Sequence, residues 1–307
     1  MTESIAIVGA GSIGATIAFG LLCNTDDYPI KEILLVDMST DILQGQTMDL
    51  ADGASFDTVV RGATFKEAGR SSLIIITVNA PQLEDEPCDK WMNKSDRLIE
   101  GIITSMQPIR SDAFIIVVAE PVDFFINKIR RLTTLKNEHV MGIGYMSIYH
   151  YRFAKWIEEC YKGLKGVPPP YITRPYVIGS VKSPLIIWPQ LQNQANELEE
   201  LKSLWINTNM FQFDLIKEKK GDAWYGVSSL TIQLFKALFY PNNNNNNTNN
   251  NDHASTFILS TYCSQFDICT SLPVYVNNLG VSAIVNIGIT ETEKKHLIST
   301  SMDSIQH

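Results

Sequence analysis

The chain has 307 residues, which is enough for two domains that each bury a hydrophobic core. Apolar residues make up 45% of it and charged residues 19%, a balance typical of folded globular proteins rather than of disordered or fibrous ones. The formal net charge is −8, and no stretch concentrates the basic residues that a nucleic acid or an anionic membrane attracts. We therefore expect neither as a partner.

Short apolar runs and scattered cysteines predict a cytoplasmic protein. The longest runs, such as residues 73–78 and 114–119, are far below the roughly 20 residues of a membrane span, and they indicate buried strands. An acidic residue stands near the N-terminus, where a signal peptide carries basic ones. The five cysteines show no CxxC spacing, so we expect neither a disulfide framework nor a metal site.

The first half of the chain alternates apolar strands with helical segments. Strands are predicted over residues 4–9, 32–37, 73–78 and 114–118, and helical periodicity runs from Ser12 to Asn24. Continuously apolar strands that alternate with helices are typical of a parallel sheet covered on both faces, which binds ligands beyond the carboxyl ends of its strands. Residues 1–143 are therefore predicted to form a doubly wound α/β domain.

The pattern changes after this point, and residues 144–307 are predicted to form a second, α+β domain. It begins with a helix over residues 147–161, continues through a proline cluster at 168–170, and ends with a helix that stops near Met302. Residues 242–251 comprise nine asparagines and one threonine, a tract that cannot bury apolar surface and is predicted to be a disordered insertion. The alternative, stacking of the tract in cross-β fashion, is less favoured for one short segment.

A glycine motif follows the first predicted strand. Residues 9–14 read G-x-G-x-x-G and open the first helix, the context in which this motif binds a dinucleotide. Gly9 permits a tight turn, Gly11 lets the backbone approach a pyrophosphate, and Gly14 allows the helix to pack closely on the strand. The N–H groups at the start of the helix, from Ser12 and Ile13 onward, face the anion.

An acid at the end of the second strand completes this pattern. Asp37 follows the last glycine of the motif by 23 residues and is placed to accept hydrogen bonds from the adenosine ribose hydroxyls. A carboxylate there repels a 2′-phosphate, so NAD is the predicted cofactor rather than NADP. The alternative is a glycine turn that serves strand–helix packing alone. The predicted cofactor-binding residues are Gly9, Gly11, Ser12, Ile13, Gly14 and Asp37.

Further segments resemble the lactate/malate dehydrogenase family over nearly the whole chain. The resemblance implies an N-terminal Rossmann domain and a C-terminal lactate/malate dehydrogenase-like domain. It is carried by residues 35–37 with 45–50, the loop start Ala80-Pro81-Gln82, the turn Pro121-Val122-Asp123, Arg152-Phe153, Val177-Ile178-Gly179, Trp224, and residues 271–274 before 278–281.

The family reaction, as the resemblance implies it, transfers a hydride between NAD and a 2-hydroxy acid. A histidine exchanges the proton of the substrate alcohol, and an aspartate orients that histidine. One arginine binds the substrate carboxylate in a bidentate fashion, and another, on a loop, polarises the carbonyl. The hydride passes directly to the nicotinamide, so the protein supplies placement and charge.

Most of these groups are replaced in this chain. The resemblance aligns the catalytic histidine with Val181, its aspartate with Tyr149 and the loop arginine with Cys88. The substrate-binding arginine is retained as Arg152. Loss of a positioned acid–base group costs about 10²–10⁴ in rate, and loss of a charge-stabilising group costs about 10²–10³ more. We therefore expect no catalytic residue at the family positions and an inactive dehydrogenase.

Two further replacements add negative charge to the predicted substrate site. Glu120 stands where the family has an asparagine, and Asp222 stands where it commonly has a threonine. Leu83 occupies the loop position that separates lactate from malate enzymes, and it is neither the amide of the first nor the arginine of the second. Carboxylates at these places oppose an anionic substrate.

Three hypotheses follow. The first is a pseudoenzyme that binds NAD(H) without 2-hydroxy-acid dehydrogenase activity. The second is an active or divergent NAD-dependent oxidoreductase of this type, with a small carbonyl or 2-hydroxy-acid ligand and with Lys182 or His150 handling the proton. The third is a relic that binds nothing. The resemblance also implies a homo-oligomer or an assembly with a related subunit.

Overall fold

The computed structural model describes residues 2–81, 83, 86–163, 175–181, 183–187, 203, 205, 212–240 and 255–306. The predictions for the proline cluster at 168–170, the asparagine tract at 242–251 and Lys182 lie outside the described residues. Within the described part, no helix is long and apolar enough to cross a membrane.

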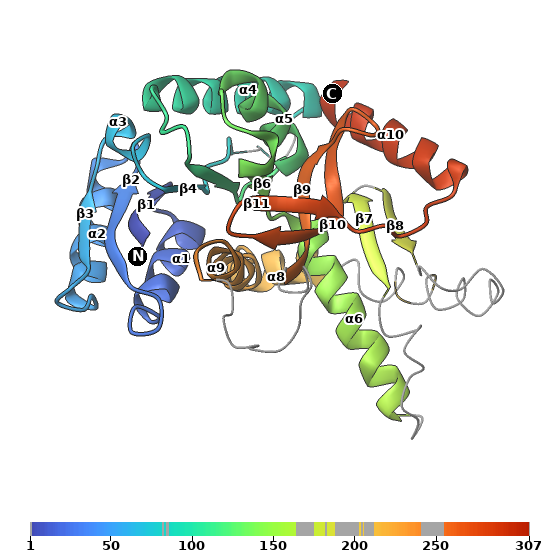
Figure 1. The fold of residues 1–307 in the computed structure, drawn as a ribbon, viewed down its shortest axis with the longest axis horizontal. Coiled ribbons are helices and arrows are strands. Elements are labelled where there is room, and N and C mark those ends of the chain that lie inside the picture. The colour runs from blue at the N-terminus through green and yellow to red at the C-terminus, as the bar shows by residue number, and fades with distance from the viewer. Residues whose placement is uncertain are drawn as a thin grey trace.

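The first half of the chain forms a six-stranded parallel sheet in the order β3-β2-β1-β4-β5-β6 (Figure 1). The order reverses between β1 and β4, which are neighbours although β2 and β3 intervene in sequence. The elements are β1 (Thr2–Val8), α1 (Ser12–Leu22), β2 (Ile30–Val36), α2 (Thr40–Asp52), β3 (Val59–Gly62), α3 (Phe65–Ala68), β4 (Leu73–Ile76), α4 (Cys88–Met106), β5 (Phe114–Val117), α5 (Val122–Leu132), a 3₁₀ turn (Asn137–His139) and β6 (Val140–Gly142).

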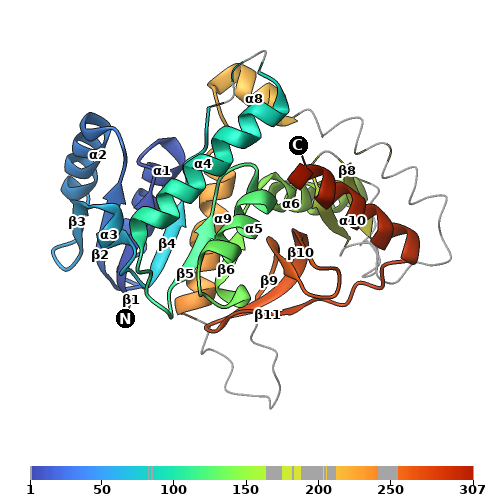
Figure 2. The same cartoon turned by 90° about the horizontal axis from the view of Figure 1, so that it is seen from above.

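The second half extends the same sheet with antiparallel strands. Strand β9 pairs with β6 at Ser260 and Gly142, and the order continues β9-β10-β7-β8, with β11 on β10. Figure 2 shows α10 alongside these strands and α9 beneath the parallel part. The elements are α6 (Tyr145–Gly163), β7 (Tyr176–Ser180), β8 (Ser183–Ile187), α8 (Gln212–Lys220), α9 (Tyr225–Phe239), β9 (Ser255–Cys263), β10 (Ile268–Asn277), β11 (Gly280–Ile284) and α10 (Glu291–Gln306).

Alternate residues of the buried parallel strands β1, β2, β4 and β5 enter two different hydrophobic clusters, one on each face. Ile5 and Ile7 of β1 belong to the cluster that holds the apolar side of α1 and α9. Ala6 and Val8 belong to the cluster that holds α4 and α5. A strand buried on both faces has no position for a polar side chain, which explains the continuous apolar runs in the sequence. The predicted doubly wound α/β fold is confirmed.

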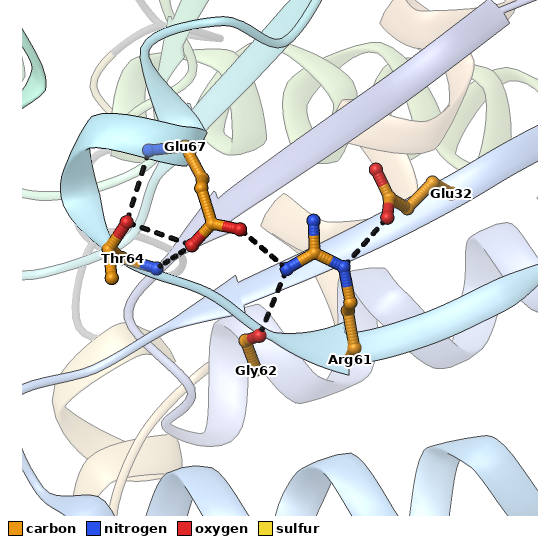
Figure 3. A network of polar contacts seen from close by, with 5 residues as sticks. All are labelled: Glu32, Arg61, Gly62, Thr64 and Glu67. Carbon is orange, nitrogen blue, oxygen red and sulfur yellow. Dashed lines mark hydrogen bonds and ion pairs between the residues drawn. The ribbon is translucent and has the colours of Figure 1, made fainter.

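A charged network joins β2, β3 and α3 at the edge of this sheet (Figure 3). Arg61 donates from Nε to Glu32 and from Nη1 to Glu67, both at 2.8 Å. Thr64 caps α3, because its hydroxyl accepts from the Glu67 N–H while the Glu67 carboxylate accepts from the Thr64 N–H. These hydrogen bonds lower the pKa of Glu67 to about 2.

Two strands of the parallel sheet are missing from the sequence prediction. Strand β3 is a four-residue edge strand with no fully buried residue, and β6 has only three residues. Strand β3 lacks the continuous apolar run of β4 and β5 because it is partly exposed, and β6 is too short to show a pattern. The predicted last helix extends four residues further than expected, to Gln306. The proposed domain boundary falls between β6 and α6 and stays a prediction, and one sheet runs across it.

Candidate nucleotide-binding site

The turn between β1 and α1 is held tightly by the neighbouring strands. The Gly9 N–H donates to the carbonyl of Val36 at 2.7 Å, and the Thr77 hydroxyl donates to the Gly9 carbonyl at 3.0 Å. Gly9 has a φ of +109°, and a Cβ there would lie 2.6 Å from Thr77 Oγ1. Only glycine meets both conditions without strain, so this turn is the tight one that the motif predicts.

The start of α1 leaves space for a ligand. Gly11 is the N-cap of α1, and a Cβ built on it would meet no protein atom within 4 Å. Gly11, Ser12 and Ile13 line a pocket at this point. Open space at the glycine and unpaired N–H groups at the helix N-terminus fit the pyrophosphate of a dinucleotide.

Asp37 is fixed directly beside this turn. Its Oδ2 accepts a hydrogen bond from the Ala10 N–H at 2.8 Å, and its Oδ1 accepts one from the Ser39 N–H at 2.8 Å. A carboxylate has about four acceptor positions, so lone pairs remain for ribose hydroxyls. The contact with Ala10 links the acid to the glycine motif, a relationship that the sequence analysis does not predict.

A pocket of about 220 Å³ opens beyond the carboxyl ends of β1, β4, β5 and β6. Its position at the reversal of strand order is where open α/β sheets bind their ligands. The predicted residues Gly11, Ser12 and Ile13 line it together with Glu120 and Asp222. The remaining lining residues are Thr77, Asn79, Val118, Ala119, Ile143, Gly144, Tyr145, Ala223 and Val227.

Glu120 is held in this pocket by two backbone groups. Its Oε1 accepts from the Tyr145 N–H at 3.0 Å, and its Oε2 accepts from the Val122 N–H at 3.2 Å. Burial raises the pKa of the Glu120 carboxyl, while these two hydrogen bonds act in the opposite direction. The carboxyl therefore has a fixed position at the end of β5.

A second carboxyl, Asp123, lies on the first turn of α5 close behind Glu120. The Ser260 hydroxyl of β9 donates to Asp123 Oδ1 at 2.5 Å. Burial, with a smaller contribution from the nearby charge of Glu120, raises the pKa of Asp123 to about 7, and the Ser260 hydrogen bond acts in the opposite direction. Asp123 belongs to the turn Pro121-Val122-Asp123 that carries the family resemblance, and the sequence does not predict it as a site residue.

Asp222 approaches the pocket from the segment before α9 and is exposed. Its Oδ1 accepts from the Ala223 N–H at 2.7 Å, and the Lys220 ammonium donates to its backbone carbonyl at 2.9 Å. The same ammonium lies 2.9 Å from the centre of the Trp224 ring. Solvent and the Lys220 ammonium screen the charge of Asp222, so its effect on the electrostatic potential in the pocket is weaker than that of Glu120.

Two of the replaced catalytic positions meet in an apolar cluster. Val181, in the turn between β7 and β8, packs against the cluster that contains Tyr149 of α6. Tyr149 is 4% exposed, and its ring meets Trp205 edge-on at 6.0 Å. The structure thus brings the two positions together, in surroundings that also include Phe153 and Trp205 and that disfavour charge.

The other predicted residues do not line the pocket. Arg152 is half-buried on α6, and burial lowers the pKa of its guanidinium. Cys88 is exposed at the first turn of α4, and Leu83 is exposed before it. The proposed substitute base His150 stacks on Tyr176 at 5.8 Å, and burial lowers its pKa to about 4.

Some lining residues have no counterpart in the sequence analysis. Thr77, Asn79 and Tyr145 lie just after β4 and β6. For these two residues a signal was available, because Thr77 lies near the end of a predicted buried strand and Asn79 directly follows that strand, at the ligand-binding edge of the sheet. For Tyr145 there was none, because β6 is too short to predict.

The glycine turn, the anchored acid and the pocket at the strand reversal define a doubly wound dinucleotide-binding protein. In a comparison with known families, residues 3–142 match the NAD-binding domain of lactate/malate dehydrogenases. L-lactate dehydrogenase A of Rhizopus oryzae is 29% identical over 97% of this chain and 90% of that protein. The L-lactate dehydrogenase of Staphylococcus epidermidis is 23% identical over 99% of this chain and 98% of that protein. Residues 3–142 thus match the family's NAD-binding domain, and nearly the whole chain is similar in sequence to L-lactate dehydrogenases.

Solved structures agree with this fold. A lactate dehydrogenase from a Medee basin deep-sea metagenome library aligns with a TM-score of 0.79 at 18% identity, covering 100% of both chains. The malate dehydrogenase of Salinibacter ruber aligns with a TM-score of 0.72 at 21% identity over 99% of this chain and 97% of that one. The predicted resemblance to this family and the predicted fold are confirmed, and so is NAD as the cofactor of the matched domain.

Proposed function

We propose that this protein binds NAD(H) and does not catalyse 2-hydroxy-acid dehydrogenation. The main support is the apolar packing of Val181 and Tyr149, the positions that the family resemblance assigns to the proton-transferring histidine and its aspartate. Neither side chain replaces an imidazole as a proton acceptor near neutral pH. The described members of the cluster around them are apolar or aromatic side chains, surroundings that disfavour a charged imidazole.

The charge of the pocket supports the same proposal. Among the described lining residues, the ionisable side chains are Glu120, Asp222 and Tyr145, and none is basic. A 2-hydroxy or 2-oxo acid carries a carboxylate, which such a pocket repels rather than binds. Arg152, the retained family arginine, stands outside this lining.

The cofactor part of the proposal rests on the β1–α1 turn. The open space at Gly11 would take the pyrophosphate, the N-terminus of α1 would donate to it, and Asp37 would accept from the adenosine ribose. Bound NAD would supply the hydride chemistry of a dehydrogenase, and the chain as proposed lacks the proton transfer that must accompany it.

Titration with NADH, followed by addition of pyruvate or oxaloacetate, tests this function. Saturable binding, read from NADH fluorescence, is expected together with turnover far below the usual 1–10³ s⁻¹ of enzymes. Asp37→Ala serves as the binding control and should weaken the titration. Turnover in the usual range would contradict the loss of activity, and an absence of saturable binding would favour the relic that binds nothing.

One observation favours a second candidate, a divergent NAD-dependent oxidoreductase. The Glu120 carboxyl lines the pocket, and burial raises its pKa toward the range of a general acid. An uncharged aldehyde or ketone would be the fitting substrate, since the pocket repels anions. Oxidation of NADH by such a compound, abolished in Glu120→Gln, is the result that would establish this candidate over the first.

Assembly belongs to the proposal as well. A homo-oligomer or a complex with a related subunit is expected from the family. Exposed apolar side chains on α1 and α2 favour a covered surface there, among them Phe19 at 59% and Met48 at 63% exposure. Light scattering of the purified protein tests it, and a monomer at micromolar concentration would contradict the homo-oligomer.

A further inference from the structure

We propose that the pocket discriminates between the two redox states of the dinucleotide, and that Glu120 and Asp222 favour the oxidised form over the reduced form. The inference rests on the proposed NAD(H) binding and adds to it a selectivity that does not depend on catalysis. A protein with this property would respond to oxidised rather than reduced NAD.

The strand order assigns the two halves of the dinucleotide to opposite sides of the α1 N-terminus. The acid for the adenosine ribose, Asp37, follows β2, on one side of β1. The pocket lies on the other side, beyond β4, β5 and β6. With the pyrophosphate at Gly11, the adenosine extends over β2 and the nicotinamide enters the pocket.

The nicotinamide is the part of the cofactor whose charge changes. It is a pyridinium cation in NAD⁺ and a neutral ring in NADH, whereas the pyrophosphate and adenosine are the same in both. A difference between the affinities for NAD⁺ and NADH therefore measures the electrostatic potential inside the pocket. The described lining residues supply two carboxylates to this field and no basic side chain.

The expected size of the effect follows from Coulomb's law. A carboxylate about 8 Å from a unit positive charge, at an effective dielectric constant of about 20–40, favours the cation by about 5- to 30-fold. A neutral dihydronicotinamide gains nothing from the same charge. One well-placed carboxylate is thus enough for a measurable preference.

Glu120 is the better placed of the two carboxylates. Two backbone N–H groups fix its oxygens, and Gly144 leaves the space they occupy, since a Cβ there would lie 2.7 Å from Glu120 Oε1. The carboxylate cannot turn away without losing these hydrogen bonds. Asp222 is exposed and lies near the Lys220 ammonium, so we expect a smaller contribution from it.

Protonation of Glu120 gives a second, independent readout. Burial raises its pKa, and the titratable groups around it are Asp123 of α5, Tyr145 of α6 and Asp222 before α9. A bound pyridinium favours the ionised carboxylate, so NAD⁺ binding should release protons and NADH binding should not. Preference for NAD⁺ should accordingly increase as the pH rises through the raised pKa of Glu120.

Calorimetric titration of the full-length protein with NAD⁺ and with NADH tests the proposal. Glu120→Gln should reduce the preference for NAD⁺ by about 5- to 30-fold, and Asp222→Asn should reduce it by less. The matched control is Asp52→Asn. Asp52 is an exposed acid at the last residue of α2, about 18 Å from the first residue of that helix, which follows β2. This variant should leave the ratio of the two dissociation constants unchanged.

The outcomes are separable. Folding of Glu120→Gln is checked by thermal melting, and the proton-release measurement on the wild-type protein in two buffers needs no variant. An unchanged ratio in a folded Glu120→Gln, or equal proton release with NAD⁺ and NADH, would overturn the redox selectivity and leave the proposed function standing. Failure of both nucleotides to bind the wild-type protein would overturn the proposed function and this inference with it.

Discussion

A Cβ on Gly14 would lie 1.9 Å from the carbonyl oxygen of Gly9, so the first turn of α1 packs directly on the backbone of the glycine turn. The obstacle is main chain, which cannot rotate away as a side chain does. This contact is what makes the third glycine of the motif a structural requirement, separate from any contact with a ligand.

Gly14→Ala should therefore destabilise the protein itself. Overpacking against backbone forces α1 away from β1, at a cost of about 2–4 kcal/mol in the free energy of unfolding. Urea unfolding followed by circular dichroism measures it. A urea midpoint equal to that of the wild-type protein would show that α1 does not pack as closely on the Gly9 carbonyl as the structure indicates.

Gly11→Ala is the matched case with the opposite outcome. Gly11 has a φ of −73°, which any residue adopts, and its Cβ would meet no protein atom. The free energy of unfolding should change by less than about 1 kcal/mol. Binding of NADH should weaken at least about tenfold, because the methyl group takes up space at the pyrophosphate. Unaltered affinity in a folded variant would argue against the assigned position of the pyrophosphate.

Stability should depend on pH through Asp123. Its pKa is about 7 in the folded chain and near the ordinary 3.8 in the unfolded chain, so between these values the native state holds a proton that the unfolded state has lost. Its contribution is most favourable below pH 4 and is lost as the pH rises to 7. Over that interval it changes by up to about 4 kcal/mol, at 1.36 kcal/mol per pH unit.

Asp123→Asn isolates this contribution. The amide oxygen can still accept from Ser260, so the contact is kept while the titration is removed. Carboxylates with a lowered pKa, such as Glu67 at about 2, make stability depend on pH in the opposite direction. Their contribution is the same in the variant and in the wild-type protein, so it cancels in the difference between the two. Unfolding measured from pH 4 to 7 should show the variant gaining stability relative to wild type, and parallel curves would refute the buried, protonated Asp123.

The network at the sheet edge should depend on its cap more than on its ion pairs. Thr64→Ala removes the hydroxyl that accepts from the Glu67 N–H, and we expect a loss of about 1 kcal/mol. Arg61→Met removes the ion pairs of Arg61 with Glu32 and Glu67. Because the side chains of Arg61 and Glu67 are each about 40% exposed, solvent screens these pairs, and the loss in the free energy of unfolding should stay well under about 1 kcal/mol. Thermal unfolding of both variants compares them, and a larger loss for Arg61→Met would reverse the ranking.

The sequence by itself determined four of the six parallel strands, β1, β2, β4 and β5, and the nucleotide motif. A strand that is buried on two faces needs a continuous apolar run, such as Leu73–Ile76, and the positive φ of the turn requires glycine at position 9. Both features can be recognised from a few neighbouring residues of the sequence. The acid Asp37 was placed correctly after β2 for the same reason.

Only the tertiary structure decided what these groups meet. The Asp37 carboxylate receives the Ala10 N–H across two strands, Glu120 receives the Tyr145 N–H, and Val181 joins Tyr149 and Trp205 in one apolar cluster. Each contact joins segments separated by about 25 residues or more. Their charges, burial and pKa values depend on distances between those segments, which arise only when the sheet assembles.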